Sequence, residues 1–260
     1  MLSTSGMAFL KNLLRFIYSI WGLFIFGVFI LTTYFIALLA FWMYGKRSFF
    51  KLFPWYKGWS NVWLFLMGIK IEVEGLEHLK PNTSYIVVGN HSSTLDIFAM
   101  ASGIPFPFKS LAKRELGDIP IVGFLFKSGC VHVDRDNPES RKKSVEEVKQ
   151  ELKQGFSILI MPEGTRNKSP KPLGPFKDGA FRIAIEMQVP IMPVVILNIR
   201  NLMPHPKWLI QGPGRFKVRF MEPVIVDSLT ETDMPALKEK LYQQLEAELL
   251  ANDLYFADRN

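Results

Sequence analysis

Hydrophobic and polar positions follow two different patterns along the chain. Residues 17–44 form an apolar run of 28 residues without one charged side chain. As a helix this run would reach about 42 Å at about 1.5 Å per residue, more than the ~30 Å hydrocarbon core of a bilayer. The run predicts a membrane-embedded helix, with a buried core helix of a soluble protein as the alternative. Residues 59–67 predict a second helix at the membrane interface, and the pattern leaves open whether the first helix spans the bilayer or is half-immersed.

From residue 69 onward, short apolar runs alternate with amphipathic segments, which is typical of an α/β domain. Strands are expected at residues 69–73, 85–89, 108–112, 131–133, 157–161, 191–199 and 217–221. Helices are expected at residues 95–101, 120–126, 139–154, 178–187 and 234–251. We therefore expect membrane-anchoring helices in residues 1–69 and one α/β domain in residues 70–260.

The charge distribution supports this division. The chain carries 31 basic and 24 acidic residues, a net charge of +7 that on its own would indicate nucleic acid or an anionic membrane as partner. Residues 1–70 hold seven basic residues and no acidic one, so the remainder of the chain is balanced at 24 of each sign. A bilayer is thus the expected partner, and nucleic acid is not.

Basic residues on the two sides of the apolar run predict its orientation. Only Lys11 and Arg15 precede the run. Four basic residues follow it closely, namely Lys46, Arg47, Lys51 and Lys57. By the positive-inside rule, the α/β domain should lie on the cytoplasmic face of the cell (inner) membrane.

Cysteine and histidine usage disfavours a metal enzyme. Cys130 is the single cysteine, and the four histidines are widely spaced without a paired-ligand motif. We expect neither a bound metal nor another resident cofactor.

The first candidate for chemistry is the pair His91 and Asp96, which follows the apolar segment 85–89. Five residues apart, the two cannot share one helical face, but they can meet if His91 lies in a turn and Asp96 in the first turn of the next helix. Asp96 would then orient the imidazole as the partner of a general base. The competing interpretation is a capping box formed by Ser93 and Asp96, with a surface histidine beside it.

The second candidate is the sequence Pro162-Glu-Gly-Thr-Arg166, which follows the expected strand 157–161. Gly164 permits a tight turn, and Thr165 and Arg166 offer donors suited to a phosphate or carboxylate. A solvated basic loop is the simpler alternative.

Taken together, the two segments resemble the glycerolipid acyltransferase superfamily, and most closely the bacterial 1-acyl-sn-glycerol-3-phosphate (lysophosphatidic acid) acyltransferases. Two further blocks are similar to motifs of that family, and the four occur in the expected order over residues 70–225. These blocks are Lys113 to Pro120 with Gly123 and the later Val133-Asp-Arg135, and Val189-Pro-Ile-Met-Pro-Val194. Met161 and Asn167 depart from the usual Phe and Ser of the third motif, which puts acceptor preference in doubt.

The resemblance implies a mixed, largely parallel sheet flanked by helices, an N-terminal membrane-binding segment and specific roles. His91, supported by Asp96, would take the proton of the sn-2 hydroxyl as that hydroxyl attacks an acyl thioester. Arg166 with Lys113 would bind the acceptor phosphate, although Lys113 could equally be an ordinary surface lysine. Glu163 would orient Arg166 or a substrate hydroxyl. The expected substrate-binding group is Lys113, Glu163, Gly164, Thr165 and Arg166.

The implied partners are lysophosphatidic acid, a phospholipid bilayer, and acyl-CoA or acyl carrier protein as acyl donor. Two alternatives remain. One is acylation of a different lysolipid or of an amino-acid lipid, and the other is a noncatalytic membrane-attached binding protein.

Overall fold

The computed structural model describes residues 4–45, 48–134, 137–204 and 208–257. Lys46, Arg47 and Arg135, on which sequence predictions rested, lie outside these residues. Seven strands form one sheet within the described part of the chain: β1 Ile69–Glu74, β2 Ile86–Gly89, β3 Phe108–Lys113, β4 Cys130–Val133, β5 Ser157–Ile160, β6 Ile191–Leu197 and β7 Gly214–Phe220. The α-helices are α1 Thr4–Tyr44, α2 Ser48–Leu66, α3 Asp96–Gly103, α4 Val122–Gly129, α5 Pro138–Lys153, α6 Gly179–Met187, α7 Ile199–Leu202, α8 Met234–Asn252 and α9 Leu254–Ala257.

The sheet order is β1-β7-β6-β2-β5-β3-β4, and every pair is parallel except β6 with β7. The predicted mixed, largely parallel sheet is thereby confirmed. Every residue of β2, β5 and β6 is buried, as expected for strands that helices cover on both faces. These three strands form the centre of the sheet, so their ends are fixed by packing from two sides.

Most predicted elements occur within a few residues of their expected bounds. The expected strand 191–199 is too long, because β6 ends at Leu197 and α7 follows. Asn198 separates the two with a left-handed φ of 67°. The expected interfacial helix 59–67 is too short, because α2 already begins at Ser48 and contains Pro54.

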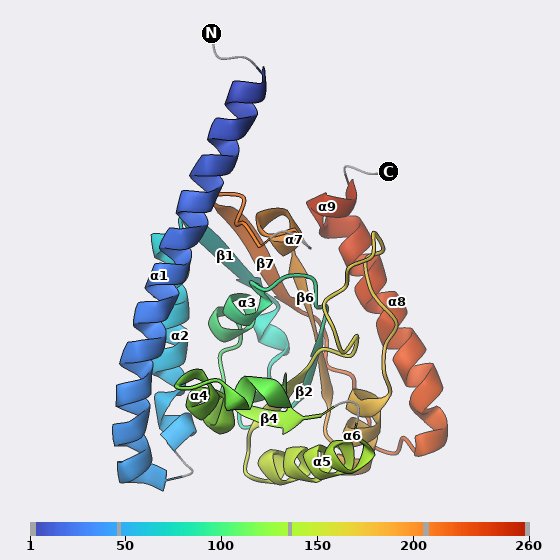
Figure 1. Ribbon diagram of the computed structural model, residues 1–260. Helices are drawn as coiled ribbons and strands as arrows, with labels where there is room; N and C mark the ends of the chain where they lie inside the picture. Colours follow the sequence, from blue (N-terminus) through green and yellow to red (C-terminus); the bar gives the residue numbers. More distant parts are fainter. Residues whose placement is uncertain (1–3, 46–47, 135–136, 205–207, 258–260) are drawn as a thin grey trace.

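Helices cover both faces of the sheet (Figure 1), and an apolar core lies on each face. Alternation along β2 divides its side chains between them: Ile86 and Val88 face α5, α6 and α8, whereas Val87 faces α2 and α3. Ile25 of α1 and Trp63 of α2 belong to the same core as Val87. The N-terminal helices therefore contribute to the core of the α/β domain, and the division at residue 69 stays a prediction.

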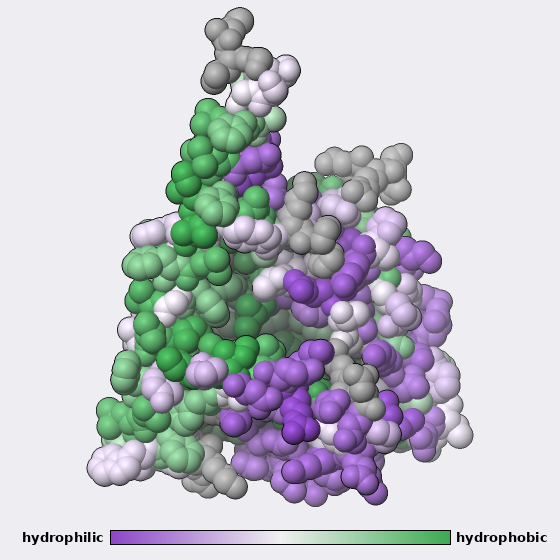
Figure 2. All heavy atoms as spheres, in the orientation of Figure 1, coloured by the Kyte–Doolittle hydropathy of each residue, from purple (hydrophilic) through white to green (hydrophobic). Residues whose placement is uncertain are grey.

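Helix α1 packs against the domain along a stripe of mostly small side chains. Its buried residues are Ser19, Gly22, Ile25, Thr33, Ala37 and Ala40. A Cβ at Gly22 would lie 2.9 Å from Cε of Met67, so glycine allows α1 to approach closely here. The opposite side of α1 exposes many large apolar side chains, and Figure 2 shows this apolar surface along α1. Among the described residues, α1 is the one helix long and apolar enough to cross a membrane.

Trp63 connects the N-terminal helices to the domain. It is 3% exposed, its Nε1 donates to the carbonyl of Gly22 at 2.9 Å, and its ring stacks on Phe98 of α3 at 3.9 Å. Removing this ring would leave a cavity shared by three helices.

Trp63→Ala is therefore expected to destabilise the whole protein by about 3–5 kcal/mol, the usual cost of removing a buried aromatic ring. Chemical unfolding in detergent would measure the loss, with Phe65→Ala as the control because Phe65, on the same helix, is 80% exposed. Equal losses in the two variants would contradict the packing described here.

Candidate active site

The loops that follow β2 and β5 meet at one edge of the sheet. Val88 pairs with Ile160 in parallel register, so both strands end at the same level. The chain then leaves β2 toward α3 on one face and leaves β5 toward α6 on the other face. Diverging connections at the carboxyl ends of parallel strands open a crevice, which is the usual ligand site in open α/β sheets.

A hollow in the molecular surface lies near this edge. Figure 2 shows it between the apolar surface along α1 and a polar surface on the opposite side. In the same orientation, Figure 1 places the loop leading into α3 and the yellow loop after β5 beside this region. An apolar side and a polar side thus meet where the two loops converge.

The structure brings His91 and Asp96 together. Nδ1 of His91 lies 2.7 Å from Oδ2 of Asp96, and Asp96 is buried whereas the His91 side chain is 29% exposed. Facing an ionised carboxylate, which only accepts hydrogen bonds, a neutral imidazole in this position would carry its proton on Nδ1 and present the lone pair of Nε2. This is the tautomer that a general base requires.

The capping interpretation is also partly realised, by the same carboxylate. Oδ2 of Asp96 accepts from the backbone N–H of Ser92 at 2.8 Å and of Ser93 at 3.0 Å. The reciprocal bond of a capping box is missing, because Oγ of Ser93 accepts from Leu95 N–H at 3.2 Å. Asp96 therefore fixes the turn that carries His91 and orients its ring at the same time.

Glu163 bridges the two loops of the site. Oε1 accepts from His91 N–H at 2.8 Å, and Oε2 accepts from Gly174 N–H at 2.7 Å. Burial raises the pKa of Glu163, while these two amides and the nearby charges of His91 and Arg200 act in the opposite direction. The carboxylate of Glu163 does not contact Arg166 as expected. It instead holds the backbone N–H groups of His91 and Gly174.

Two asparagines complete the framework around these loops. Asn90 is buried and extends the pairing of β2 with β6, because its amide donates to Ile196 O at 3.0 Å and accepts from Ile196 N–H at 2.7 Å. Backbone N–H of Asn167 donates to His91 O at 2.7 Å. The Asn167 side chain donates to Lys171 O at 2.9 Å and accepts from Ser169 N–H at 2.9 Å. Asn167, noted in the sequence as a departure from the family pattern, thus shapes its own loop.

Of the remaining residues of the third motif, Arg166 contacts the loop after β2. Arg166 donates from Nη1 to the hydroxyl of Thr94, and Thr165 is exposed. Gly164 has φ 71°, and a Cβ there would lie 3.0 Å from Cε of Lys177. Arg166 therefore lies one hydrogen bond from the loop that carries His91, with its other nitrogens available to an anion.

Lys113 is less closely integrated. It ends β3, beyond β5 from His91 in the sheet order, and its side chain is 63% exposed. Its ammonium pairs with Glu115 at 3.2 Å. The structure places Lys113 at the same edge of the sheet as Arg166 without a contact between them, so the surface-lysine alternative stays open.

Sequence reasoning missed Arg200 and Asp253, two buried charged residues near these loops. The signal available for either was weak, since each is a single charge beside an apolar segment. In the described part of the chain, no three His, Cys, Asp or Glu side chains are grouped as metal ligands would be.

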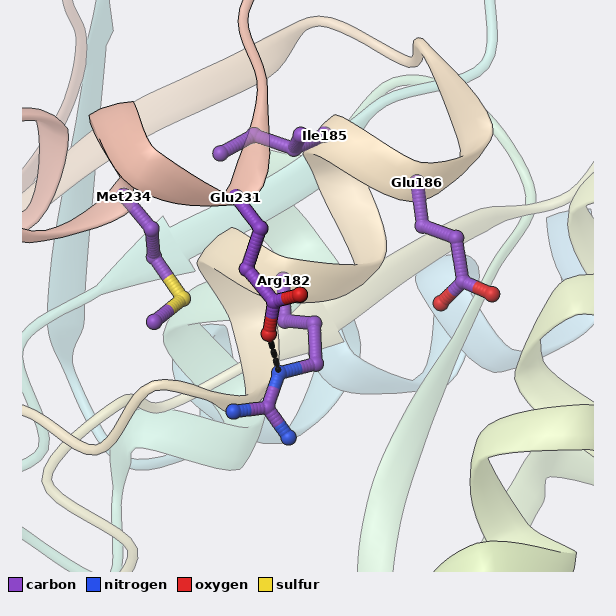
Figure 3. A pocket seen from close by; sticks show the side chains of 5 residues that line it. All are labelled: Arg182, Ile185, Glu186, Glu231 and Met234. Carbon is purple, nitrogen blue, oxygen red and sulfur yellow. Dashed lines mark ion pairs between the residues drawn. The ribbon is translucent and has the colours of Figure 1, made fainter.

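A separate surface pocket of about 320 Å³ has no part in this site. It is lined by Arg182, Ile185, Glu186, Glu231 and Met234 (Figure 3). Helix α6 leads from the loop of the site back to the start of β6, so this pocket lies toward the opposite edge of the sheet. The Arg182–Glu231 ion pair across it, at 3.4 Å, is exposed.

Comparisons with known proteins place this arrangement in a family. Residues 70–197 match the Acyltransferase family. The chain is 36% identical over 181 residues to 1-acyl-sn-glycerol-3-phosphate acyltransferase alpha of Mus musculus. The matched region covers 68% of this chain and 62% of the mouse protein. The acl-2 protein of Caenorhabditis elegans, whose name places it in the same family, is 31% identical over 209 residues, 78% of this chain and 71% of that protein. The chain thus spans less than two thirds of the mouse relative's length.

The fold agrees with a solved structure. The crystal structure of the 1-acyl-sn-glycerophosphate (LPA) acyltransferase PlsC from Thermotoga maritima superposes with a TM-score of 0.79 at 23% identity, covering 92% of this chain and 96% of that one. Sequence matches across the motif-bearing region and this shared fold lead to one conclusion. The chain belongs to the 1-acyl-sn-glycerol-3-phosphate acyltransferase family.

Proposed function

We propose that this protein transfers a fatty acyl group from a thioester donor to the sn-2 hydroxyl of 1-acyl-sn-glycerol-3-phosphate, giving phosphatidic acid. The observation that carries the proposal is the 2.7 Å contact between His91 and Asp96. Arg166 is hydrogen-bonded to Thr94, in the same loop as this pair. The names of the mouse relative and of the Thermotoga protein agree with this substrate.

The proposed mechanism needs no covalent enzyme intermediate. Nε2 of His91 accepts the proton of the acceptor hydroxyl as its oxygen attacks the thioester carbonyl. Asp96 stabilises the imidazolium that forms. When the tetrahedral intermediate collapses, the carbon–sulfur bond breaks, the ester remains on the acceptor, and the imidazolium returns its proton to the leaving thiolate.

Arg166 would hold the acceptor phosphate while His91 acts on the hydroxyl. A guanidinium binds phosphate through two parallel hydrogen bonds, which orients the acceptor as well as attracting it. Lys113, together with Gly164 and Thr165 in the turn before Arg166, would add further contacts to the headgroup. The donor would be acyl-CoA or acyl carrier protein, approaching from water.

The packing of α1 supports a half-immersed helix. Contacts with the rest of the protein run at least from Phe16, whose ring meets Trp208, to Phe41, whose ring meets Phe124 of α4. These 26 residues correspond to about 39 Å, more than the length needed to cross ~30 Å of hydrocarbon. A spanning α1 would draw the polar domain into the bilayer, so α1 is proposed to lie in the cytoplasmic leaflet of the cell membrane with its exposed apolar side toward lipid.

Replacing the proposed base should abolish turnover without unfolding the protein. His91→Ala is expected to lower kcat by about 10²–10⁴, the usual contribution of a general base. Transfer of a labelled acyl group to lysophosphatidic acid would measure it, with His78→Ala as the matched control because His78 lies in a surface turn. Unchanged turnover in His91→Ala would rule out the dyad mechanism.

Arg166→Ala should distinguish acceptors by their phosphate. We expect kcat/KM for lysophosphatidic acid to fall at least about tenfold, since a charged hydrogen bond contributes about 1.5–3 kcal/mol. Transfer to a monoacylglycerol, which lacks the phosphate, should change little. The exposed neighbour Lys168→Ala serves as control. An equal loss for both acceptors would contradict the phosphate role, and a wild type that prefers another acceptor would favour the alternative lysolipid reading.

The position of the N-terminus tests the half-immersed helix. With the protein inserted into vesicles from outside, a cysteine at Ser5 should react with a membrane-impermeant maleimide as readily as one at the exposed Lys168. The unsubstituted protein gives the background from Cys130. Protection of the Ser5→Cys thiol until the vesicles are opened would show a spanning helix instead.

A further inference from the structure

A buried arginine that the proposed acyl transfer does not use lies beneath the loop after β5. Arg200 of α7 is 5% exposed, and its Nη1 donates to the carbonyls of Ser169 at 3.2 Å and Lys171 at 3.5 Å. Its guanidinium carbon lies 5.0 Å from the ring centre of Tyr255 and 5.3 Å from that of Phe256. Arg200 therefore joins the C-terminal segment to the active-site loop.

The C-terminal segment is itself held by reciprocal hydrogen bonds. Asp253 is buried, and its carboxylate accepts from Asn198 N–H at 3.0 Å and from Tyr255 N–H at 2.9 Å. Oδ1 of Asn198 accepts from Leu254 N–H at 2.8 Å. Because Asn198 directly precedes α7, these bonds fix the segment 253–257 against the helix turn that carries Arg200.

The loop that Arg200 holds is the one that leads to the dyad. Lys171 O accepts from both Arg200 and Asn167, and the backbone of Asn167 binds His91 O. Three residues beyond Lys171, Gly174 N–H binds the same Glu163 carboxylate that accepts His91 N–H. A displacement at residues 169–171 would thus reach the backbone of His91 by two routes.

The energetic cost of burying Arg200 indicates a role beyond simple packing. A buried guanidinium loses much of its hydration, and its Nη2 has no hydrogen-bond partner within the described residues. Apolar side chains of similar volume would often be as stabilising in such a place. What they could not supply are the two donated hydrogen bonds and the positive charge close to Glu163 and Asp253.

We propose that Arg200, clamped by the segment 253–257, is a positioning residue of the active site. It fixes residues 167–174 so that the amides of Gly174 and His91 both reach the carboxylate of Glu163. This inference rests on the proposed acyl transfer for its catalytic consequence, but the structural coupling can be measured without turnover.

The charge of Arg200 also predicts a pH effect through Glu163. The groups facing Glu163 are the amides of His91 and Gly174, the His91 ring, Arg200 and the Tyr242 hydroxyl group of α8. Burial raises the pKa of Glu163 and Arg200 opposes that rise, so removing Arg200 should move the pKa further upward. Protonation would then weaken the acceptor of His91 N–H at a higher pH than in the wild type.

Arg200→Met is expected to lower kcat by about 10–100-fold, as a displacement of about 1 Å can do, while KM for lysophosphatidic acid changes little because Arg166 is intact. The acid limb of the kcat profile should move to higher pH. Arg200→Lys should restore the position of that limb while recovering only part of kcat. Arg182→Met, an exposed arginine toward the opposite edge of the sheet (Figure 3), is the matched control and should keep the wild-type profile.

Amide hydrogen exchange of the full-length protein gives a second readout that does not depend on activity. Arg200→Met should speed exchange in a peptide covering residues 163–176 and in the peptide containing His91, relative to Arg182→Met. Asp253→Asn preserves the side-chain shape in the segment 253–257 and should increase exchange in the same peptides by a smaller factor. This variant keeps the test valid if Arg200→Met folds poorly.

The outcomes separate the two proposals. If Arg200→Met exchanges faster but the wild-type protein transfers no acyl group, the positioning role of Arg200 is supported and the proposed function is overturned. Unchanged exchange in both variants, or a kcat that falls only with the folded fraction at an unchanged pH profile, would overturn the positioning role of Arg200.

Discussion

The carboxylate of Glu163 is the point on which the geometry of the site depends. Its two oxygens accept N–H groups from loops that follow different strands, one at His91 and one at Gly174. The loops are also joined by Asn167 N–H to His91 O and by Arg166 to Thr94, but among the described residues Glu163 alone contacts both His91 and the distant Gly174. A single buried acceptor thus converts two adjacent strand ends into one rigid frame.

Burial of this carboxylate is tolerable because charge and hydrogen bonding are matched around it. Desolvation raises the pKa of Glu163, and the two amides and the Arg200 charge favour its ionised form. Asp96 is also held by backbone, since Oδ2 accepts from two amides and contacts the His91 ring, whereas its buried Oδ1 has no hydrogen-bond partner among the described residues. Both acids are therefore held by backbone, and the His91 side chain remains partly exposed. Rigid carboxylates beneath an accessible base are suited to proton transfer at a fixed position.

Sequence patterns predicted the strands and an α/β domain, because these depend on local periodicity. Spacing allowed His91 to meet Asp96 without deciding against a helix cap, and the resemblance to the acyltransferase family implied both the largely parallel sheet and the pair. None of these predicted the partners of Glu163. That carboxylate meets His91 across 72 positions and Gly174 across 11, so its partners follow from sheet order and loop shape rather than from adjacent residues. Arg200 and Asp253 were missed for the same reason. The sequence prediction also places the end of β6 too late. The left-handed backbone of Asn198 ends the strand, and hydropathy does not report backbone conformation.

The shared core has a consequence for how the site meets a bilayer. Trp63 and Ile25 pack in the same cluster as Phe216 and Val87, so the apolar surface of α1 and the strands that carry His91 move as one body. A flexible linker would let the site sample many depths and orientations above the lipid. Here the orientation is set by packing at Gly22 and Trp63 instead. If α1 rests in the leaflet and the protein acylates a lysolipid as proposed, the depth to which the headgroup must rise is therefore a property of the fold, and the anchor would form part of the substrate-positioning structure.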